Sequence, residues 1–240
     1  MASTLIIIPT YNEIENISNI IPKIFNCLSN CHVLVVDDNS PDGTSRSVKE
    51  LIKNCEENIF IIDRLNKTGL GDAYIDGFRW ALEKKYDYIF EMDADFSHDP
   101  ASLPFMLEKL KEKEADVIIG SRYKDGVNVV NWPLSRILLS YFASLYVRLI
   151  TRMPVKDPTA GFVGYSREVL NSLDLNKIKF IGYAFQIEMK YKSWINGFKL
   201  VEYPIIFKNR TRGTSKMDQS IILEAFIGVI RLRFFDRNTK

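Results

Sequence analysis

Short apolar runs alternate with longer segments of helical periodicity through the first half of the chain. The apolar runs are rich in Ile and Val and predict buried strands over Leu5–Pro9, His32–Val36, Ile59–Ile62, Tyr88–Met92 and Val117–Ile119. The segments between them repeat apolar residues at helical spacing, which predicts helices over Glu15–Leu28, Ser45–Cys55, Ala73–Lys85 and Ala101–Lys113. Pro22 predicts a kink or a late start in the first helix. This alternation predicts an α/β fold with a mostly parallel central sheet flanked by helices.

The alternation fades after residue 123. Lys124–Pro133 contains Gly, Asp, Asn and Pro and reads as a flexible loop. The remaining patterns predict a helix over Leu134–Ile150, a turn and short strand over Asp157–Tyr165, a helix over Phe185–Trp194, a strand over Lys199–Phe207, a basic loop over Arg210–Lys216 and an apolar helix over Ser220–Phe235. We find no internal repeat and no clear linker, and we expect one domain over residues 1–240.

Composition narrows the class of protein. The chain has 46% apolar and 26% charged residues, as ordinary globular proteins do, and its net charge of +2 gives no overall attraction to nucleic acid. Three cysteines without a Cys-x-x-Cys pair suit a reducing compartment. Neither a signal-peptide pattern nor an apolar stretch of about 18 residues is evident. We therefore expect a cytoplasmic protein.

Two aspartates one residue apart follow the apolar run that ends near Met92. In extended chain Asp93 and Asp95 point to the same side, so their carboxylates repel unless a proton or a cation lies between them. Mg²⁺ or Mn²⁺, held by these carboxylates and by substrate phosphates, would relieve the repulsion. A solvated turn at the strand end is the alternative.

Other polar segments also follow predicted strands. Asp37–Thr44 holds three carboxylates, which can cap the next helix or, through Asp38, accept hydrogen bonds from a base or ribose. Lys67–Gly71 lacks the glycine pattern of a dinucleotide fold and the ending of a P-loop, so its glycines serve a close approach to a ligand or a helix start. Ligands of open α/β sheets bind at this edge.

Basic residues are grouped in three places. Arg122 follows a strand, Arg136 and Ser140 lie on one face of a predicted helix, and the loop 210–216 carries Arg210 and Lys216. A surface cation is usually solvated, but several around a metal site suit two phosphate-bearing substrates. We find no serine or cysteine nucleophile motif and no zinc spacing, which argues against hydrolytic triad chemistry.

Five short motifs occur in order along the chain. They are Pro9-Thr10-Tyr11-Asn12-Glu13, Asp37-Asp38-Asn39-Ser40-Pro41-Asp42-Gly43-Thr44, Asp93-Ala94-Asp95, Gly120-Ser121-Arg122-Tyr123 and Gly182-Tyr183-x-Phe185-Gln186-Ile187-Glu188-Met189. Together they resemble the family 2 glycosyltransferases of the GT-A (Rossmann-like) fold, and among these the polyprenyl-phosphate (dolichyl-phosphate) mannose synthases. The resemblance implies a GDP-mannose donor, Mg²⁺ or Mn²⁺, and a polyprenyl or dolichyl phosphate acceptor. It also implies a nucleotide-sugar-binding half over 1–123 and an acceptor-binding half over 124–240 that ends in an amphipathic helix.

The resemblance also assigns roles to individual residues. It places the nucleotide at Pro9, Tyr11, Glu13, Val36 and Asp38, and the metal and diphosphate at Asp93, Ala94 and Asp95. It implies donor and phosphate contacts by Arg122, Arg210 and Lys216, an acceptor-phosphate site at Arg136 and Ser140, and catalytic roles for Asp95, Arg122 and Arg136. Some relatives carry Gln as a further metal ligand where this chain has Ser97, so Ser97 or a water would fill that position.

The implied reaction is a direct, inverting displacement that gives a β-linked mannosyl phosphate. A lipid acceptor implies a peripheral position on the cytoplasmic face of a membrane, reached through the helices over 137–143 and 220–235 or through a membrane-anchoring subunit; packing of these helices on the core is the alternative. Three other functions stay open from the residues: glucose transfer from UDP-glucose to polyprenyl phosphate, sugar transfer to a glycan hydroxyl, and a silent nucleotide-sugar-binding subunit of a membrane complex.

Overall fold

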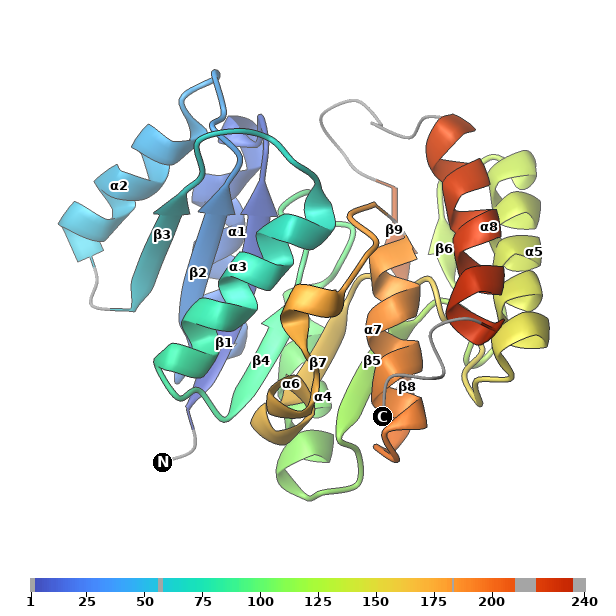
Figure 1. Ribbon diagram of the computed structural model, residues 1–240. Helices are drawn as coiled ribbons and strands as arrows, with labels where there is room; N and C mark the ends of the chain where they lie inside the picture. Colours follow the sequence, from blue (N-terminus) through green and yellow to red (C-terminus); the bar gives the residue numbers. More distant parts are fainter. Residues whose placement is uncertain (1–2, 56–57, 183, 210–218, 235–240) are drawn as a thin grey trace.

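The computed structural model describes residues 3–55, 58–182, 184–209 and 219–234. Its main element is a seven-stranded sheet in the order β3-β2-β1-β4-β7-β5-β8 (Figure 1). The strands are β1 (Thr4–Thr10), β2 (His32–Asp37), β3 (Ile59–Asp63), β4 (Tyr88–Glu91), β5 (Val117–Ser121), β7 (Val163–Ser166) and β8 (Leu200–Pro204). All neighbours pair in parallel except β7, which is antiparallel to both β4 and β5. The predicted mostly parallel sheet is confirmed.

Both faces of the sheet are covered by helices because its central strands are apolar on both sides. In β1, Ile6 and Ile8 belong to one core cluster, and Leu5 and Ile7 belong to the other. The first cluster packs against α1 (Ile14–Cys27), α2 (Thr44–Cys55), the 3-10 turn η1 (Pro100–Ser102) and α4 (Leu103–Lys111). The second packs against α3 (Leu70–Glu83), α5 (Leu134–Thr151), α6 (Arg167–Ser172), the 3-10 turn η2 (Leu175–Lys177), α7 (Ala184–Ile195) and α8 (Gln219–Phe234).

A separate two-stranded ribbon lies beside the sheet. It pairs β6 (Val129–Val130) with β9 (Phe207–Lys208). The prediction of a loop over 124–133 missed β6, and the prediction of one strand over Lys199–Phe207 was wrong because β8 ends at Pro204. Proline has no N–H for a sheet, and the next amide, that of Ile205, donates to the carbonyl of Ser121.

Helix boundaries otherwise follow the predicted periodicity closely. α1 begins at Ile14 with Pro22 inside it, so the expected late start was wrong. The short helix α6 was not predicted. Gly69 is the N-cap of α3 with φ of 130°, a backbone conformation that glycine adopts without strain. This confirms that the Lys67–Gly71 segment begins a helix.

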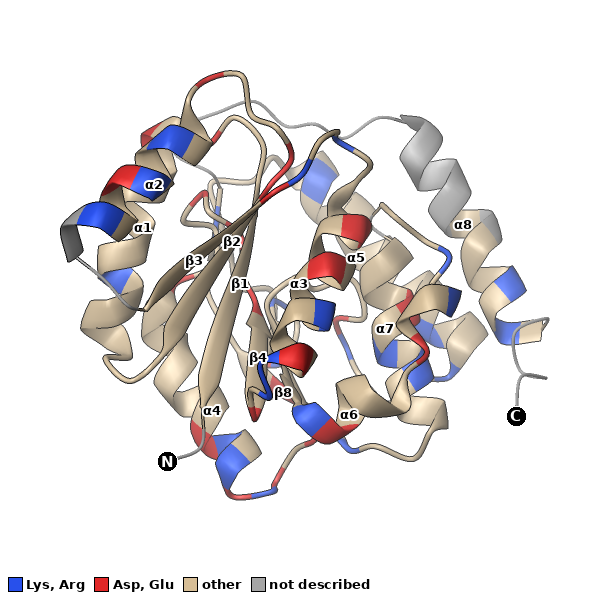
Figure 2. Ribbon diagram, turned by 60° about the vertical axis from the view of Figure 1, so that its left-hand side comes forward, with Lys and Arg blue, Asp and Glu red and all other residues tan. Residues whose placement is uncertain are grey.

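Helices α5 and α8 lie side by side at one end of the molecule, far from β3 (Figure 1). Tyr146 of α5 stacks on Phe226 of α8 with ring centroids 4.2 Å apart, and its hydroxyl donates to the Phe226 carbonyl. Among the described residues α5 is the one helix that is long and apolar enough, by length and composition alone, to cross a membrane. The sequence-based expectation that no stretch would reach this limit was therefore wrong. Lys and Arg, and likewise Asp and Glu, are spread over many of the described helices and loops (Figure 2).

Candidate active site

The candidate site begins where β4 ends, at the centre of the sheet. Asp93 has a half-exposed carboxylate, whereas Asp95 is buried and accepts a hydrogen bond from the backbone N–H of Ser97 at 3.0 Å. Phe96 between them and Ser97 has φ of 62°, an uncommon left-handed conformation for a bulky residue. The turn therefore places two carboxyl groups at the carboxyl edge of the sheet, as the sequence predicts.

His98 follows this turn and hydrogen-bonds to its backbone. Its Nδ1 accepts the backbone N–H of Asp93 at 3.1 Å, and its ring stacks on Phe162 with centroids 5.0 Å apart. Burial lowers the pKa of His98 to about 4, although the charge of Asp95 opposes this shift. The imidazole is therefore neutral at pH 7 and acts as a hydrogen-bond acceptor that fixes the Asp93 backbone.

The donor set in this turn suits a hard divalent ion. Asp93 and Asp95 offer carboxylate oxygens, and the buried Ser97 hydroxyl has no hydrogen-bond partner within the described part of the chain. Among the described residues, no group of three or more His, Cys, Asp and Glu side chains could hold a metal ion, so the protein would supply only part of the coordination shell. Mg²⁺ and Mn²⁺ sites commonly use one or two carboxylates and complete their shell with water and substrate phosphates. The residues present therefore fit a metal that binds together with a diphosphate.

A second group of polar residues surrounds the ends of β1 and β2. Arg64 forms an ion pair with the buried Asp38 and another with Asp76 at 3.0 Å. Burial raises the pKa of Asp38 even though Arg64 favours its charged form. Asp37 instead accepts the Thr10 hydroxyl at 2.8 Å and ties the two strands together. Asp38 is thus the carboxylate of this pair that stands beside a cation.

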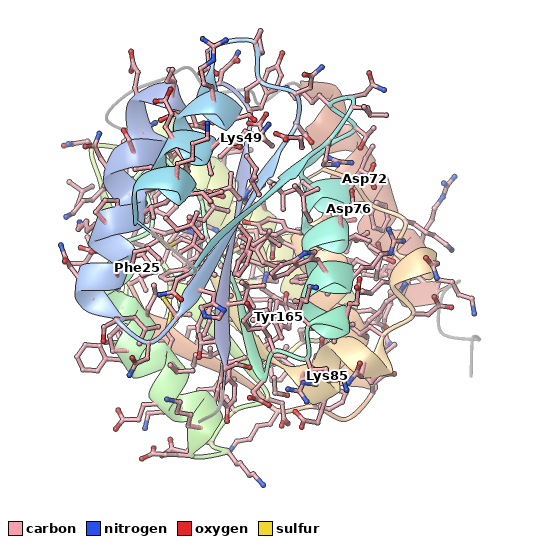
Figure 3. All side chains as sticks on the ribbon, turned by 90° about the vertical axis from the view of Figure 1, so that its left-hand side faces the viewer. Phe25, Lys49, Asp72, Asp76, Lys85 and Tyr165 are labelled. Carbon is pink, nitrogen blue, oxygen red and sulfur yellow. The ribbon has the colours of Figure 1, made fainter. Side chains whose placement is uncertain are left out.

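A cavity of about 380 Å³ is lined in part by Arg64. Its walls include Thr68 and three charged residues of α3, namely Asp72, Asp76 and Arg79. Figure 3 shows Asp72 and Asp76 on the same helix, one turn apart. The cavity therefore shares Arg64 with the Asp38 ion pair.

The other predicted nucleotide-site residues lie on or beside the first two strands. The Lys67 ammonium lies over the Tyr11 ring, 4.1 Å from its centroid. The Glu13 carboxylate accepts a hydrogen bond from the Asn16 side-chain amide at 2.8 Å. Pro9 is half-buried, whereas Val36 and Ala94 are buried in the two core clusters. The side chains of Val36 and Ala94 therefore shape the core of this region. The Asp42 carboxylate, in contrast, accepts hydrogen bonds from the backbone N–H groups of Ile14 and Thr44. These bonds confirm the predicted capping role of that loop.

Arg122 forms a buried, two-pronged ion pair with Asp157. Its Nε and Nη2 donate to the carboxylate at 2.7 and 2.6 Å, its backbone N–H donates at 2.9 Å, and Nη2 also donates to Thr159. Burial favours a neutral Asp157, but the charge and hydrogen bonds of Arg122 outweigh it and lower the pKa of Asp157. Arg122 is therefore held rigidly, and its positive charge lowers the pKa of His98, whereas the charge of Asp95 raises it.

The predicted acceptor residues lie on the first half of α5. Arg136 donates to the side chain of Asn209 at 3.0 Å and stacks on Trp132, with its guanidinium carbon 4.0 Å from the ring centroid. Ser140 accepts the Tyr123 hydroxyl at 2.8 Å. The structure thus connects Arg136 to the ribbon and Ser140 to the residue that follows Arg122. Arg210 and Lys216 lie outside the described residues.

An apolar groove of about 480 Å³ begins next to Ser140. It lies between α5 and the loop after β5 and is lined by Tyr123, Gly126, Val127, Ile137, Leu138, Tyr141, Ser144, Leu145, Arg148 and Lys156. Only Arg148 and Lys156 of these carry charge, and both are cations. The groove therefore suits a long apolar group with an anionic end.

A buried polar network supports the site from beneath. Gln186 of α7 donates to Glu91 of β4 at 2.7 Å, and the Lys190 ammonium donates to Gln186 and, at 2.6 Å, to the carbonyl of Ala160. Burial raises the pKa of Glu91 to about 8 and lowers that of Lys190 to about 8. Near them Tyr165, labelled in Figure 3, lies fully buried in the core. The network joins the strand that leads to Asp93 with the loop that carries Asp157.

Sequence reasoning missed several of these residues. Asp157, Lys190, Arg64 and Trp132 stand out only through partners that are remote in sequence or through their burial. Lys190 lies in Ala184–Ile195 together with Glu188 and Lys192, so nothing in the local sequence marks its burial.

Comparison with known proteins extends this picture. The model of the family "Glycosyl transferase family 2" matches residues 5–174. A polyprenol monophosphomannose synthase from Mycolicibacterium smegmatis is 44% identical over 226 residues, which cover 94% of this chain and 85% of that protein. An undecaprenyl-phosphate mannosyltransferase from Micrococcus luteus is 43% identical over 227 residues, with coverage of 95% and 92%.

Solved structures share the fold at low identity. A glucosyl-3-phosphoglycerate synthase from Mycobacterium tuberculosis, in complex with Mn²⁺ and UDP-glucose, aligns with a TM-score of 0.67 at 16% identity over 96% of this chain and 77% of its own. A mannosyltransferase from Pyrobaculum calidifontis, in complex with GDP-Man and Mn²⁺, aligns with a TM-score of 0.64 at 16% identity over 95% and 64%. These likenesses confirm the predicted fold.

Proposed function

This chain belongs to glycosyltransferase family 2, and from that premise we propose that it transfers mannose from GDP-mannose to a polyprenyl phosphate and releases GDP. The observation that carries the proposal is the identity of 43–44% to two polyprenyl-phosphate mannosyltransferases over at least 94% of the chain. The glycosyltransferase class and the mannosyl lipid product expected from the motifs are confirmed by these relatives. The roles of individual residues remain our proposal.

We assign the donor to the edge formed by β1, β2 and β4. Asp38, held by Arg64, accepts hydrogen bonds from the base or ribose, and Tyr11 and Glu13 line the same edge. Asp93 and Asp95 face the diphosphate with Ser97 beside them, and they would hold the divalent metal. When bound, Mg²⁺ or Mn²⁺ would neutralise the charge that develops on the leaving diphosphate. Arg210 and Lys216 would share that task.

We assign the acceptor phosphate to the side of Arg122, Arg136 and Ser140. A phosphate monoester is already anionic at pH 7 and needs no general base, unlike a sugar hydroxyl. The two arginines would orient it in line with the anomeric carbon, which gives inversion in a single displacement. The groove beside Ser140 would receive the first prenyl units, since its walls are apolar and its two charges are cations.

We propose that α5 and α8 rest on the cytoplasmic face of a membrane. Only Ser144, Val147 and Thr151 of α5 are buried. Large apolar side chains with exposures of 37–70% line both helices: Leu134, Leu138, Leu139, Tyr141, Phe142, Leu149, Phe226, Ile230 and Phe234. Arg148, Arg152, Arg231 and Arg233 lie on or next to these helices, and such cations suit anionic lipid head groups.

Replacing Leu138 and Phe142 together with Ser is expected to weaken binding to anionic vesicles by about tenfold or more, because two large side chains would no longer be inserted. Co-sedimentation with vesicles measures this. Phe105→Ser on α4, where the side chain is 54% exposed, is the matched control and should bind as the unaltered protein does. Equal vesicle binding by the double variant would contradict the membrane assignment.

The activity itself is tested by transfer of labelled mannose from GDP-mannose to a short polyprenyl phosphate. We expect mannosyl lipid with Mg²⁺ or Mn²⁺, none with EDTA, and a loss of about 100-fold or more in Asp95→Ala, because the charge on the diphosphate is then no longer balanced. Asp99→Asn is the matched control, since this half-exposed carboxylate pairs with Lys23 and Lys208 instead.

UDP-glucose serves as the rival donor in the same assay. Transfer from UDP-glucose alone would keep the fold and replace the donor. Transfer from neither donor would favour a silent nucleotide-sugar-binding subunit. A trapped glycosyl-enzyme would contradict single displacement.

A further inference from the structure

Trp132 stands at the junction between the ribbon and α5. It follows β6 and precedes Pro133, the N-cap of α5. The ribbon is closed around it, because the Phe207 amide donates to Asn128 and the Asn209 amide donates to Val130. The backbone that leads to Trp132 is therefore held by pairing between the two strands.

Two arginine guanidinium groups lie over the indole ring of Trp132. The guanidinium carbon of Arg136 lies 4.0 Å from the ring centroid, and that of Arg122 lies 5.8 Å from it. Phe207 packs against the same ring at 5.3 Å with an interplanar angle of 74°. Arginine stacks favourably on an aromatic face, and Trp is the strongest partner for a cation. The ring thus supports Arg136 directly and lies beside Arg122, which Asp157 orients.

Asn209 completes the support of Arg136. Its side-chain oxygen accepts a hydrogen bond from Arg136 Nη1 at 3.0 Å, and its side-chain nitrogen donates to the Asn131 carbonyl at 3.3 Å. The guanidinium is therefore fixed by an aromatic face and by an amide. A long, flexible side chain held in this way loses little further freedom when it binds an anion.

The indole N–H gives a second, independent observation. Trp132 Nε1 is buried and has no hydrogen-bond acceptor within the described part of the chain. Indole nitrogen only donates, and buried donors in native proteins are nearly always paired. Among the described residues, the Trp132 N–H lacks an acceptor at a place where two arginines lie close together. An oxygen of an anionic ligand would supply an acceptor for the N–H and a negative charge for the arginines.

We propose that Trp132 belongs to the acceptor-phosphate site, where its ring positions Arg136 beside Arg122 and its Nε1–H donates to a phosphate oxygen of the bound polyprenyl phosphate. The inference rests on the proposed function for the identity of the ligand. It adds a residue that neither the motifs nor the ordering of the strands indicated.

Binding can be measured without turnover. The chain has three tryptophans, so the variant Trp80→Phe/Trp194→Phe keeps Trp132 alone. Its indole fluorescence is expected to change on addition of a short polyprenyl phosphate and to change less, at equal concentration, with the unphosphorylated polyprenol. Inorganic phosphate as a third probe separates the head group from the lipid. No change with either phosphate would overturn the proposal.

Kinetics then separate the ring from the N–H. Trp132→Leu is expected to raise KM for polyprenyl phosphate about tenfold or more and to leave KM for GDP-mannose within about twofold. Trp132→Phe keeps an aromatic face and loses the donor, so its KM for the lipid should rise by a smaller factor of about three to ten. Trp194→Phe, remote on α7, is the matched control.

The two hypotheses fail differently. Unchanged KM for the lipid in both Trp132 variants of an active enzyme would overturn the inference alone. If the unaltered protein transfers no mannose but the fluorescence of Trp132 responds to polyprenyl phosphate, the proposed function falls and the site stands. Should Trp132→Leu not fold, Trp132→Phe and the fluorescence titration decide.

Discussion

Asp157→Ala is expected to lower the free energy of unfolding by about 3–5 kcal/mol, because it leaves the buried Arg122 guanidinium without its carboxylate. Mannosyl transfer should fall with it, since Arg122 would lose the two-pronged contact that orients it. Urea unfolding and the transfer assay measure the two effects. Asp157→Asn, which keeps the shape and loses the charge, should lie between the variant and the unaltered protein.

The stability difference between Asp157→Ala and the unaltered protein should depend on pH. The pKa of Asp157 is lowered in the folded state, so its contribution is fully present at neutral pH and is lost as the pH falls below about 4 towards that lowered pKa. Glu114→Ala removes an exposed partner of Lys109 and should change stability little at any pH. A pH-independent difference would contradict an ionised Asp157 in the folded protein.

Lys190→Met is expected to cost about 2–4 kcal/mol of unfolding free energy. The ammonium group donates to the carbonyls of Ala160 and Gln186 and to the Gln186 side chain, and Met cannot replace these bonds. Glu91, bridged to Lys190 by Gln186, would also lose the nearest cation. Urea unfolding measures the loss.

The Lys190 effect should reach the active site as well. Ala160 lies in the loop that carries Asp157 and Thr159, so release of its carbonyl loosens the support of Arg122. We expect Lys190→Met to show reduced mannosyl transfer even at urea concentrations below its unfolding midpoint, where the variant is still folded. Lys177→Met, which removes a surface ion pair with Asp174, is the control. Full activity of Lys190→Met would show that the loop is held by other contacts.

Much of the fold could be predicted because its central strands are uninterrupted apolar runs. β1 and β2 are buried on both faces, and such strands leave a strong signal in the sequence. β6 and β9 are two residues long, and neither pattern nor propensity marks them. The antiparallel direction of β7 is likewise a property of the chain's path, which local periodicity does not encode.

The candidate site was predictable where its residues adjoin strand ends. Asp93, Asp95 and Asp38 follow β4 and β2, so the rule that ligands bind at the carboxyl edge found them. Asp157 could not be found in this way because its partner Arg122 is 35 residues away. Trp132 read as part of a flexible loop until the ribbon around it was seen.

The pairing of β6 with β9 also determines when each half of the site can form during synthesis. The residues after β1, β2 and β4 that we assign to the nucleotide and the metal all lie before residue 98 in the sequence, whereas the contact that holds Arg136 requires Asn209. A contact across 73 residues closes late because the intervening chain must first be ordered. On the ribosome, the nascent protein can therefore form the edge of β1, β2 and β4 well before it can form the site that binds a lipid phosphate.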